Sequence, residues 1–328
     1  MDAIVAEGLT KIYRVPVKAP GLLNAVRALL NRRWRDIEAV RDATFRIGSG
    51  EIVGFLGANG AGKTTTLKML SGLLTPSGGA ARVFGRVPWE RDPEFQRMFS
   101  LVMGQRSQLW WEIPAQETFL LNKEIYGLSA AQFKTSREEL VELLDLADCM
   151  SIPVKKLSLG QRMKAELAVS LLHRPKLLLL DEPTIGLDVV MQKKVRQFIR
   201  DYARVHGATV LLTSHNMDDV VELCSRVLII ERGRLLFDGE LRKVVSKFAP
   251  HKMLRADFDR EVSPEELAAI GRVVEMTPMR ASIEIPRAEV SRRAAELLAR
   301  LPVRDLTIEE TPIDDIVRRL FREAAAQR

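Results

Sequence analysis

A glycine-rich segment between an apolar run and a helix-forming run most constrains the fold of this 328-residue chain. Residues 57–65 read Gly-Ala-Asn-Gly-Ala-Gly-Lys-Thr-Thr, which fits the pattern G-x-x-x-x-G-K-[ST] of a phosphate-binding loop. Residues 51–56 before it suit a buried parallel strand, and residues 65–70 after it suit the first turns of a helix. Glycines let backbone N–H groups close around phosphate oxygens, and the helix start adds its positive dipole end. The pattern therefore predicts a nucleotide-binding site at residues 57–65, here called the phosphate loop.

Within the phosphate loop, the lysine reaches the β- and γ-phosphates and the first threonine hydroxyl holds Mg²⁺. A nucleotide and Mg²⁺ are therefore the expected ligands of this loop. The residues expected at the nucleotide are Gly57, Asn59, Gly60, Ala61, Gly62, Lys63, Thr64 and Thr65.

The positive charge of the chain is local. The net charge is +7, and residues 11–35 contain seven basic residues and no acidic one, so the remainder is formally neutral. A broad surface for polyanions would need the charge spread over a face, so we expect no nucleic-acid partner. The hydrophobic content of 46% and charged content of 28% are those of a globular protein.

Other features of the sequence indicate a cytosolic protein with reduced thiols. No apolar run approaches the roughly 18 residues of a membrane-spanning helix, and the first residues lack the apolar core of a signal peptide. Cys149 and Cys224 lie far apart in no metal-type spacing, so we expect both as free thiols.

Residues 16–36 form an unusual insert. After Pro16 and Pro20, apolar residues recur at helical spacing as far as Trp34, with arginines mostly on the opposite side, which predicts a basic amphipathic helix. Arg33 falls within the apolar arc and would have to extend its charge to the surface. Such a helix either packs on the protein's own sheet or contacts a partner or an anionic lipid surface through residues 17–35.

Beyond the phosphate loop, apolar strands alternate with helices. Residues 114–126 and 131–146 are helical by period, and a further helix is expected over 189–206. Residues 176–181 and 209–213 read as buried strands. Alternation of this kind predicts an α/β fold with a mainly parallel, helix-covered sheet, interrupted by a helical subdomain at about 105–172.

The pattern of expected strands and helices changes after Gly239. Three short strand patterns, a helix over 290–301, a strand near 305–308 and a last helix from Ile313 predict a small α+β domain. We therefore expect two domains, 1–240 and 241–328.

Further motifs give the chain a family resemblance. Leu157-Ser158-Leu159-Gly160-Gln161 lies between the phosphate loop and Leu180-Asp181-Glu182. With these motifs in order, residues 1–240 resemble the ATP-binding subunit of an ABC transporter, a P-loop NTPase of the ABC ATPase type.

This resemblance implies a role for each matched residue at the phosphates. Lys63 neutralises them, Glu182 polarises the attacking water, and His215 contacts the γ-phosphate. Gln105 senses Mg²⁺ and water, and Asp181 anchors Mg²⁺. The chemistry agrees, because ATP hydrolysis is chiefly positioning and charge neutralisation.

Other matched residues are implied to bind ATP or a second subunit. Tyr13 resembles the aromatic that stacks on adenine, although a tyrosine upstream of a phosphate loop is by itself better explained as an edge-strand residue. Ser158, Gly160 and Gln161 belong to the signature loop, which acts on the nucleotide of a second copy, and Asp188 bridges the two copies. One set of motifs per chain therefore implies a head-to-tail dimer around two ATP molecules.

The signature loop departs from the family at one position. Leu159 stands where the family usually has a glycine, while Ser158 and Gly160 are intact. We expect altered loop geometry and a working ATPase.

The resemblance also implies membrane partners. Transport requires separate permease subunits, so the protein is expected at the cytoplasmic face of the membrane. In relatives a permease helix docks near the glutamine loop, where Trp110 and Trp111 are either contact residues or core residues. The region after Gly239 resembles the extension of bacterial drug-resistance and sodium-extrusion exporters, which favours export.

Two other classes of function were weighed. A soluble ABC ATPase acting on nucleic acid or ribosomes would favour two motif sets or long coiled coils, and neither is present in this sequence. A regulatory module with an inactive site conflicts with the presence of Lys63, Asp181, Glu182 and His215. The remaining histidines (His173, His206 and His251) are expected to be surface or packing residues.

Overall fold

A computed structural model describes residues 1–16, 34–104, 107–243 and 251–310. The chain divides into two compact units, Met1–Gly239 and Glu240–Arg328. Among the described residues, no helix is both long and apolar enough to cross a membrane.

The first unit is built on a six-stranded sheet with the order β5-β6-β7-β3-β8-β9. The pairs from β5 to β8 along this order are parallel. Their buried strands are continuous apolar runs, as expected for parallel strands covered on both faces. The strands are β3 (Ile52–Leu56), β5 (Phe99–Met103), β6 (Leu177–Asp181), β7 (Thr209–Thr213), β8 (Arg226–Glu231) and β9 (Arg234–Glu240).

Helices follow the strands that carry the site. One helix begins directly after the phosphate loop, and two others begin just beyond the ends of β6 and β7. These helices are α2 (Lys63–Leu70), α7 (Val189–His206) and α8 (Met217–Leu223), and a short helix α3 (Pro93–Gln96) precedes β5. The predicted α/β class of an ABC-type ATPase is confirmed.

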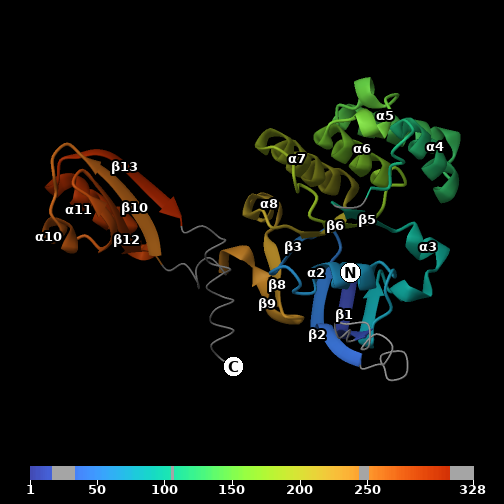
Figure 1. The fold of residues 1–328 in the computed structure, drawn as a ribbon, viewed down its shortest axis with the longest axis horizontal. Helices are drawn as coiled ribbons and strands as arrows, with labels where there is room; N and C mark the ends of the chain where they lie inside the picture. The colour runs from blue at the N-terminus through green and yellow to red at the C-terminus, as the bar shows by residue number, and fades with distance from the viewer. Residues whose placement is uncertain (17–33, 105–106, 244–250, 311–328) are drawn as a thin grey trace, which may run out of the picture. The chain divides into compact units, whose positions relative to one another are not determined.

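A group of three helices lies above β5 and β6 in Figure 1. The group consists of α4 (Ala115–Tyr126), α5 (Ala130–Leu143) and α6 (Leu159–Leu171), and α6 packs on β5. From Met163 to Leu171 every residue of α6 is buried, so α6 is the centre of the group.

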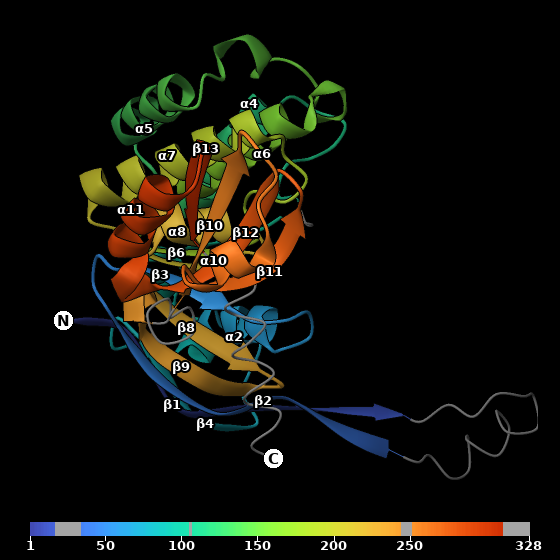
Figure 2. The same cartoon turned by 90° about the vertical axis from the view of Figure 1, so that its left-hand side faces the viewer.

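A three-stranded antiparallel sheet, ordered β2-β1-β4, packs against the six-stranded sheet through one apolar core. Its strands are β1 (Asp2–Pro16), β2 (Trp34–Gly48) and β4 (Gly78–Val83). Phe45 of β2 and Phe55 of β3 contribute rings 6.3 Å apart to this core. Figure 2 shows the ends of β1 and β2 projecting beyond the rest of the unit.

The helix predicted after Pro20, within the insert at residues 16–36, is wrong at its C-terminal end, where Trp34 and Arg35 lie in a strand. Pro16 and residues 34–36 belong to β1 and β2, where Pro16 pairs with Trp34 and Arg14 pairs with Asp36. The guanidinium of Arg14 lies 5.7 Å from the Trp34 ring, a cross-strand contact that stabilises the extended hairpin. Residues 17–33, which hold the rest of the predicted helix, lie outside the described residues.

The second unit is a four-stranded antiparallel sheet, ordered β11-β12-β10-β13, with apolar residues of two helices in its core. The strands are β10 (His251–Phe258), β11 (Arg272–Thr277), β12 (Arg280–Pro286) and β13 (Val303–Glu310), and the helices are α10 (Pro264–Ala268) and α11 (Val290–Arg300). This unit has the predicted α+β composition. The helix predicted from Ile313 lies outside the described residues.

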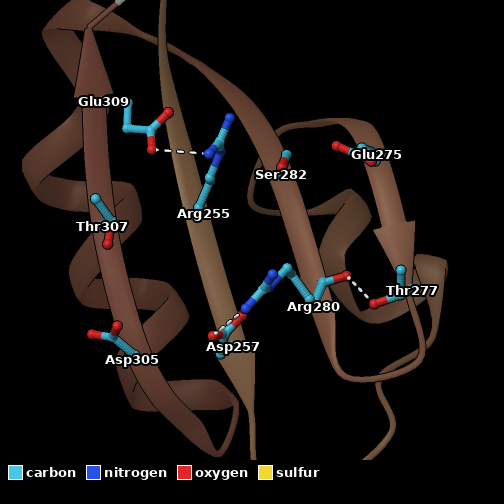
Figure 3. A pocket seen from close by; sticks show the side chains of 9 residues that line it. All are labelled: Arg255, Asp257, Glu275, Thr277, Arg280, Ser282, Asp305, Thr307 and Glu309. Carbon is cyan, nitrogen blue, oxygen red and sulfur yellow. Dashed lines mark hydrogen bonds and ion pairs between the residues drawn. The ribbon is translucent and has the colours of Figure 1, made fainter.

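The sheet of the second unit has a polar face opposite its core (Figure 3). Arg280 and Asp257 form an ion pair on neighbouring strands, and Arg255 lies 3.2 Å from Glu309. Successive side chains of a strand point to opposite faces of the sheet. The apolar residues that alternate with these charged residues therefore face the core.

Candidate nucleotide-binding and hydrolysis site

The phosphate loop runs from the end of β3 to the start of α2, and its glycines are required by space and by backbone geometry. A Cβ atom on Gly57 would lie 2.4 Å from the Ile230 carbonyl oxygen. Gly62 has a φ of 113°, and a Cβ there would lie 2.4 Å from the Ala39 carbonyl oxygen. Any larger residue at either position would force β8 or β2 away from the loop.

Lys63 folds back over its own loop. Its Nζ donates hydrogen bonds to the carbonyl oxygens of Gly57 at 2.7 Å and Ala58 at 3.3 Å, and the side chain is buried. Burial lowers the pKa of Lys63, while the nearby carboxylates of Glu182 and Asp181 oppose that shift. The ammonium group is therefore positioned over the loop, where an anion would satisfy its charge.

Two hydroxyl groups meet the carboxylate of Asp181 at the end of β6. Thr64 Oγ1 donates to Asp181 Oδ2 at 2.8 Å, and Thr213 Oγ1 donates to Asp181 Oδ1 at 2.7 Å. Oxygen ligands of this kind suit Mg²⁺, which usually keeps several waters beside one or two carboxylates and substrate phosphates. Thr64 and Asp181 therefore offer oxygen ligands that fit a magnesium site. Gln105, the other residue expected at the metal, lies outside the described residues.

Glu182 and His215 face each other across β6 and β7. His215 Nε2 lies 2.7 Å from Glu182 Oε1. Glu182 has a φ of 57°, a left-handed conformation that is uncommon outside glycine, and its N–H donates to the Thr213 carbonyl oxygen at 3.1 Å. This backbone turn directs the carboxylate away from β6 and toward the histidine.

A close backbone contact supports this turn. A Cβ on Gly104 would lie 2.5 Å from the carbonyl oxygen of Glu182, and the Gly104 N–H donates to Asp181 at 2.9 Å. Gly104 was not singled out from the sequence, although its place at the end of a strand pattern was a signal. Thr213 was also missed, although it directly precedes Ser214 and His215.

The signature loop begins α6 and lies apart from this cluster. Ser158 caps the helix by accepting from the Gln161 N–H, while Gln161 Oε1 accepts from the Ser158 N–H at 2.9 Å. A Cβ on Gly160 would lie 3.1 Å from Met191 Cε, so this residue packs closely on α7. In the described part of this single chain, no hydrogen bond joins these three residues to the phosphate loop.

Leu159, the departure from the family pattern, is 41% exposed. Its Cδ2 would lie 3.2 Å from a Cβ on Gly186, in the loop that leads to Asp188. Asp188 caps α7 by accepting from the Met191 N–H at 2.9 Å. The signature loop and the loop before α7 are therefore neighbours on one surface of the chain.

Tyr13 lies on β1 opposite Ile37 of β2 and is half-buried. Lys11, two residues before Tyr13, pairs with Val40 of β2. Val40 lies beside the phosphate loop, because its side chain is 3.2 Å from the position of a Cβ on Gly62. Lys11 Nζ lies 5.6 Å from the Tyr13 ring centre. Tyr13 is therefore placed just beyond the loop along the hairpin.

The predicted site residues therefore fall into one group whose side chains lie together and a second group that lies apart from it. Carboxyl ends of parallel strands share one edge of a sheet, so the residues at the ends of β3, β6 and β7 come together there. The clustered side chains are Lys63, Thr64, Asp181, Glu182 and His215, whereas Ser158, Gly160, Gln161, Asp188 and Tyr13 have no hydrogen bond to them among the described residues.

Comparison with known proteins agrees with this geometry. The family model described as "ABC transporter" matches residues 40–185, and the model described as "EvrA-like ABC transporter, C-terminal domain" matches residues 250–309. The ATP-binding protein NatA of Bacillus subtilis is 35% identical over 65% of this chain and 88% of its own length. The daunorubicin/doxorubicin resistance ATP-binding protein DrrA of Streptomyces peucetius is 30% identical over 86% of this chain and 88% of its own.

A solved structure has the same fold as the first unit. It is an ATP-binding cassette in a dimeric, post-hydrolysis state bound to ADP and phosphate. The match has a TM-score of 0.60 at 22% identity and covers 73% of this chain and 99% of that one. Together with the two relatives, the motifs at the strand ends lead to one conclusion: this chain belongs to the ATP-binding proteins of ABC transporters.

Proposed function

We propose that two copies of this chain close head to tail around two ATP molecules and that hydrolysis drives export through separate membrane subunits. The observation that carries the proposal is that one chain does not bring all of the predicted site residues together. One chain brings together Lys63, Thr64, Asp181, Glu182 and His215, while its own Ser158 is occupied in capping α6 and is not bonded to the phosphate loop. The signature of a second copy would complete the pocket.

The proposed roles follow from the geometry. Lys63 exchanges its bonds to loop carbonyls for bonds to the β- and γ-phosphates. Thr64 and Asp181 hold Mg²⁺, with Gln105 as an expected third contact, and the bound ion supplies positive charge opposite the phosphate oxygens. Glu182 orients the attacking water, and His215, whose Nε2 lies 2.7 Å from the Glu182 carboxylate, contacts the γ-phosphate.

The remaining nucleotide contacts are proposed on placement. Tyr13 stacks on adenine just beyond the phosphate loop, whose residues 57–65 surround the phosphates. Ser158, Gly160 and Gln161 reach the ATP of the other copy, and Asp188 lies beside them to bridge the copies. The dimeric state of the solved cassette with the same fold supports this arrangement.

Complementation between two inactive variants tests the dimer. Lys63→Ala removes the phosphate contact in cis, and Ser158→Arg blocks the signature in trans. Each variant alone is expected to lose ATPase activity. In an equal mixture half of the dimers are mixed and hold one intact site, so about a quarter of the wild-type activity should return if the sites act independently. An inactive mixture, or an active Ser158→Arg variant, would contradict the head-to-tail site.

Export is proposed from the relatives and from the second unit. DrrA is a resistance protein by its name, and residues 250–309 match the C-terminal domain of an EvrA-like ABC transporter. We infer separate permease subunits and a location at the cytoplasmic face of the membrane. Purification of the tagged chain from detergent extracts should bring a multi-span membrane protein with it, and purification with RNA alone would contradict a transport role.

The surface proposed for the permease contains two tryptophans. Trp110 and Trp111 are 59% and 51% exposed, so they are not core residues, and they lie in the loop before α4, outside any helix. The guanidinium of Arg162 lies 5.4 Å from the Trp111 ring and holds it against α6. Exposed aromatic residues of this kind suit a buried protein contact.

Lipid contact is proposed for the end of the β1–β2 hairpin. Trp34 and Ile37 are nearly half exposed there, and residues 17–33 between the strands carry four basic residues and no acidic one. Because Pro16 pairs with Trp34, an Asn-Gly turn can replace residues 17–33 and keep the hairpin closed. This variant should lose most binding to anionic vesicles, at about 1 kcal/mol per basic residue, and keep its ATP affinity. Unchanged sedimentation with anionic vesicles would contradict the proposal.

A further inference from the structure

A buried carboxylate on α8 lies behind the proposed catalytic pair. Asp219 is fully buried, and its Oδ2 accepts hydrogen bonds from Thr184 Oγ1 at 2.5 Å and Ser214 Oγ at 2.6 Å. Its Oδ1 accepts from Arg196 Nη1 of α7 at 3.0 Å. One carboxylate therefore joins the loop after β6, the loop after β7 and helix α7.

The two loops that Asp219 joins are those that carry Glu182 and His215. Thr184 follows Glu182 by two residues, and Ser214 directly precedes His215. The contact of Glu182 with His215 and the bridge of Thr184, Asp219 and Ser214 are therefore two successive links between the same loops. The outer link contains the groups proposed to act on ATP, and the inner link is buried.

The inner link also reaches the segment that is proposed to contact a second copy. Ser214 Oγ accepts from the Asn216 N–H at 3.0 Å, and Asn216 Nδ2 donates to Gln192 Oε1 at 2.9 Å. Gln192 Nε2 in turn donates to the Leu187 carbonyl oxygen at 3.0 Å, next to Asp188. A continuous set of hydrogen bonds thus connects Ser214, which directly precedes His215, to the loop before α7.

The charge of Asp219 is balanced within the protein. The Arg196 guanidinium, itself almost fully buried, also lies 3.1 Å from Glu222, which is 38% exposed. Three donors converge on Asp219, which suits an ionised carboxylate, because that group only accepts hydrogen bonds. An amide in its place would offer N–H donors to a hydroxyl that needs an acceptor.

We propose that Asp219 is a positioning residue that holds Glu182 and His215 in register for hydrolysis and ties both to the loop before α7. The inference rests on the proposed roles of Glu182 and His215. Asp219 contacts neither the phosphate loop nor Lys63 through any hydrogen bond among the described residues, so it should affect the chemical step and leave ATP binding intact. Misplacement of reacting groups by about 1 Å costs roughly 10²-fold in rate.

The test measures kcat and ATP affinity separately in the full chain. Asp219→Asn keeps the shape and is expected to lower kcat roughly tenfold to a hundredfold, while the Kd of a non-hydrolysable ATP analogue stays within about twofold. Thr184→Val removes one donor without changing side-chain shape and should lower kcat in the same way. Thr184→Val therefore tests the same link if Asp219→Asn does not fold. The two changes combined should cost less than the product of their single effects, because both break one link.

The matched control is Glu222→Gln, which removes the other, half-exposed partner of Arg196. This variant should keep kcat within about twofold of the wild type. A kcat of Asp219→Asn equal to that of Glu222→Gln would overturn the inference, and so would a parallel loss of ATP affinity and kcat. Failure of the proposed function is distinguishable, since the wild type would then lack ATPase activity or Glu182→Gln would retain it.

Discussion

His215 Nε2 lies 2.7 Å from Glu182 Oε1, which joins the ends of two adjacent parallel strands. The contact requires the left-handed backbone of Glu182, because an extended residue there would continue the direction of β6. The histidine is 43% exposed and the carboxylate is less so. The pair therefore stands at the surface of the site, where a γ-phosphate and a water molecule can reach it.

The first prediction concerns this carboxylate. Glu182→Gln keeps the contact to His215 but removes the charge that orients water, so kcat should fall roughly 10²-fold or more with ATP affinity unchanged. ATP then remains bound and holds the two copies together. Size-exclusion chromatography with ATP and Mg²⁺ should show a stable dimer of the variant. Glu240→Gln, at the end of β9, is the control and should elute as the wild type does, whereas a variant that stays monomeric would contradict the assignment.

The second prediction concerns the magnesium site. Thr64→Val keeps the shape of the side chain and removes the hydroxyl that donates to Asp181. The tightening of ATP binding by Mg²⁺ should fall roughly tenfold to a hundredfold, by analogy with the loss of other metal-site contacts. Calorimetric titration with ATP in Mg²⁺ and in EDTA measures the tightening, and the EDTA titration is the internal control. An equal loss in both conditions would show damage to the loop and no role at the metal.

The third prediction concerns the connection between the tryptophan loop and the signature helix. Glu166 on α6 is buried and accepts from Ser107 Oγ at 2.8 Å, the Gln108 N–H at 2.5 Å and the Leu109 N–H. Burial raises the pKa of Glu166, while these hydrogen bonds oppose the shift. The loop before Trp110 and Trp111 is thereby attached to the helix that starts at Ser158.

Glu166→Ala leaves those donors without a partner, at a cost of about 1–3 kcal/mol. Amide hydrogens of residues 107–113 should exchange roughly fivefold to 150-fold faster in this variant, as that cost implies. Glu117→Ala, an exposed carboxylate on α4, is the control and should leave the exchange unchanged. Equal exchange in both variants would show that Glu166 does not hold the loop.

Much of the fold follows from periodic sequence patterns. The helix over 189–206 and the strand over 209–213 have the bounds predicted for them, because Asp188 caps the helix, Gly207 ends it in a left-handed turn, and the next five residues are all buried. The family assignment and the α/β class are also confirmed. A strand, a glycine-rich turn and a helix in this order permit few architectures.

The errors have local causes. Trp34 and its neighbours have helical spacing with the residues before them, but their backbone pairs with β1, and this tertiary pairing overrides the local helical pattern. The short helix α10 was missed although Ser263, Pro264 and Glu266 are a capping box with proline at the first turn. Its five residues are too few for a periodic pattern.

The site is predictable only in part. Motif residues at strand ends are recognisable one by one, and the parallel sheet brings them together. The buried contacts behind them are not, because Asp219 meets Thr184 across 35 positions and nothing in the local sequence marks the pair. The roles assigned to the site residues, Lys63, Glu182 and His215 included, stay predictions.

The fourth prediction concerns pH and a buried histidine. His173 stacks on the Tyr126 ring at 3.7 Å and donates from Nε2 to the Phe99 carbonyl oxygen at 3.2 Å, while its buried Nδ1 has no partner in the described part of the chain. Burial lowers the pKa of His173 to about 4, with the bond to Phe99 opposing the shift. The unfolded chain, with a pKa near 6.5, then binds this proton more readily than the folded one.

The stabilising effect of neutral His173 is therefore complete above pH 6.5 and is lost as the pH falls toward 4. Between pH 7.5 and pH 5 the free energy of unfolding should decrease by about 2 kcal/mol through this one group. His173→Gln keeps an N–H donor and cannot titrate, so its urea unfolding should lack that part of the decrease. His251→Gln, in the second unit, is the control and should follow the wild type. If His173→Gln and the wild type lose equal stability over this range, the pKa of His173 does not differ between the folded and unfolded chain, which would contradict the prediction.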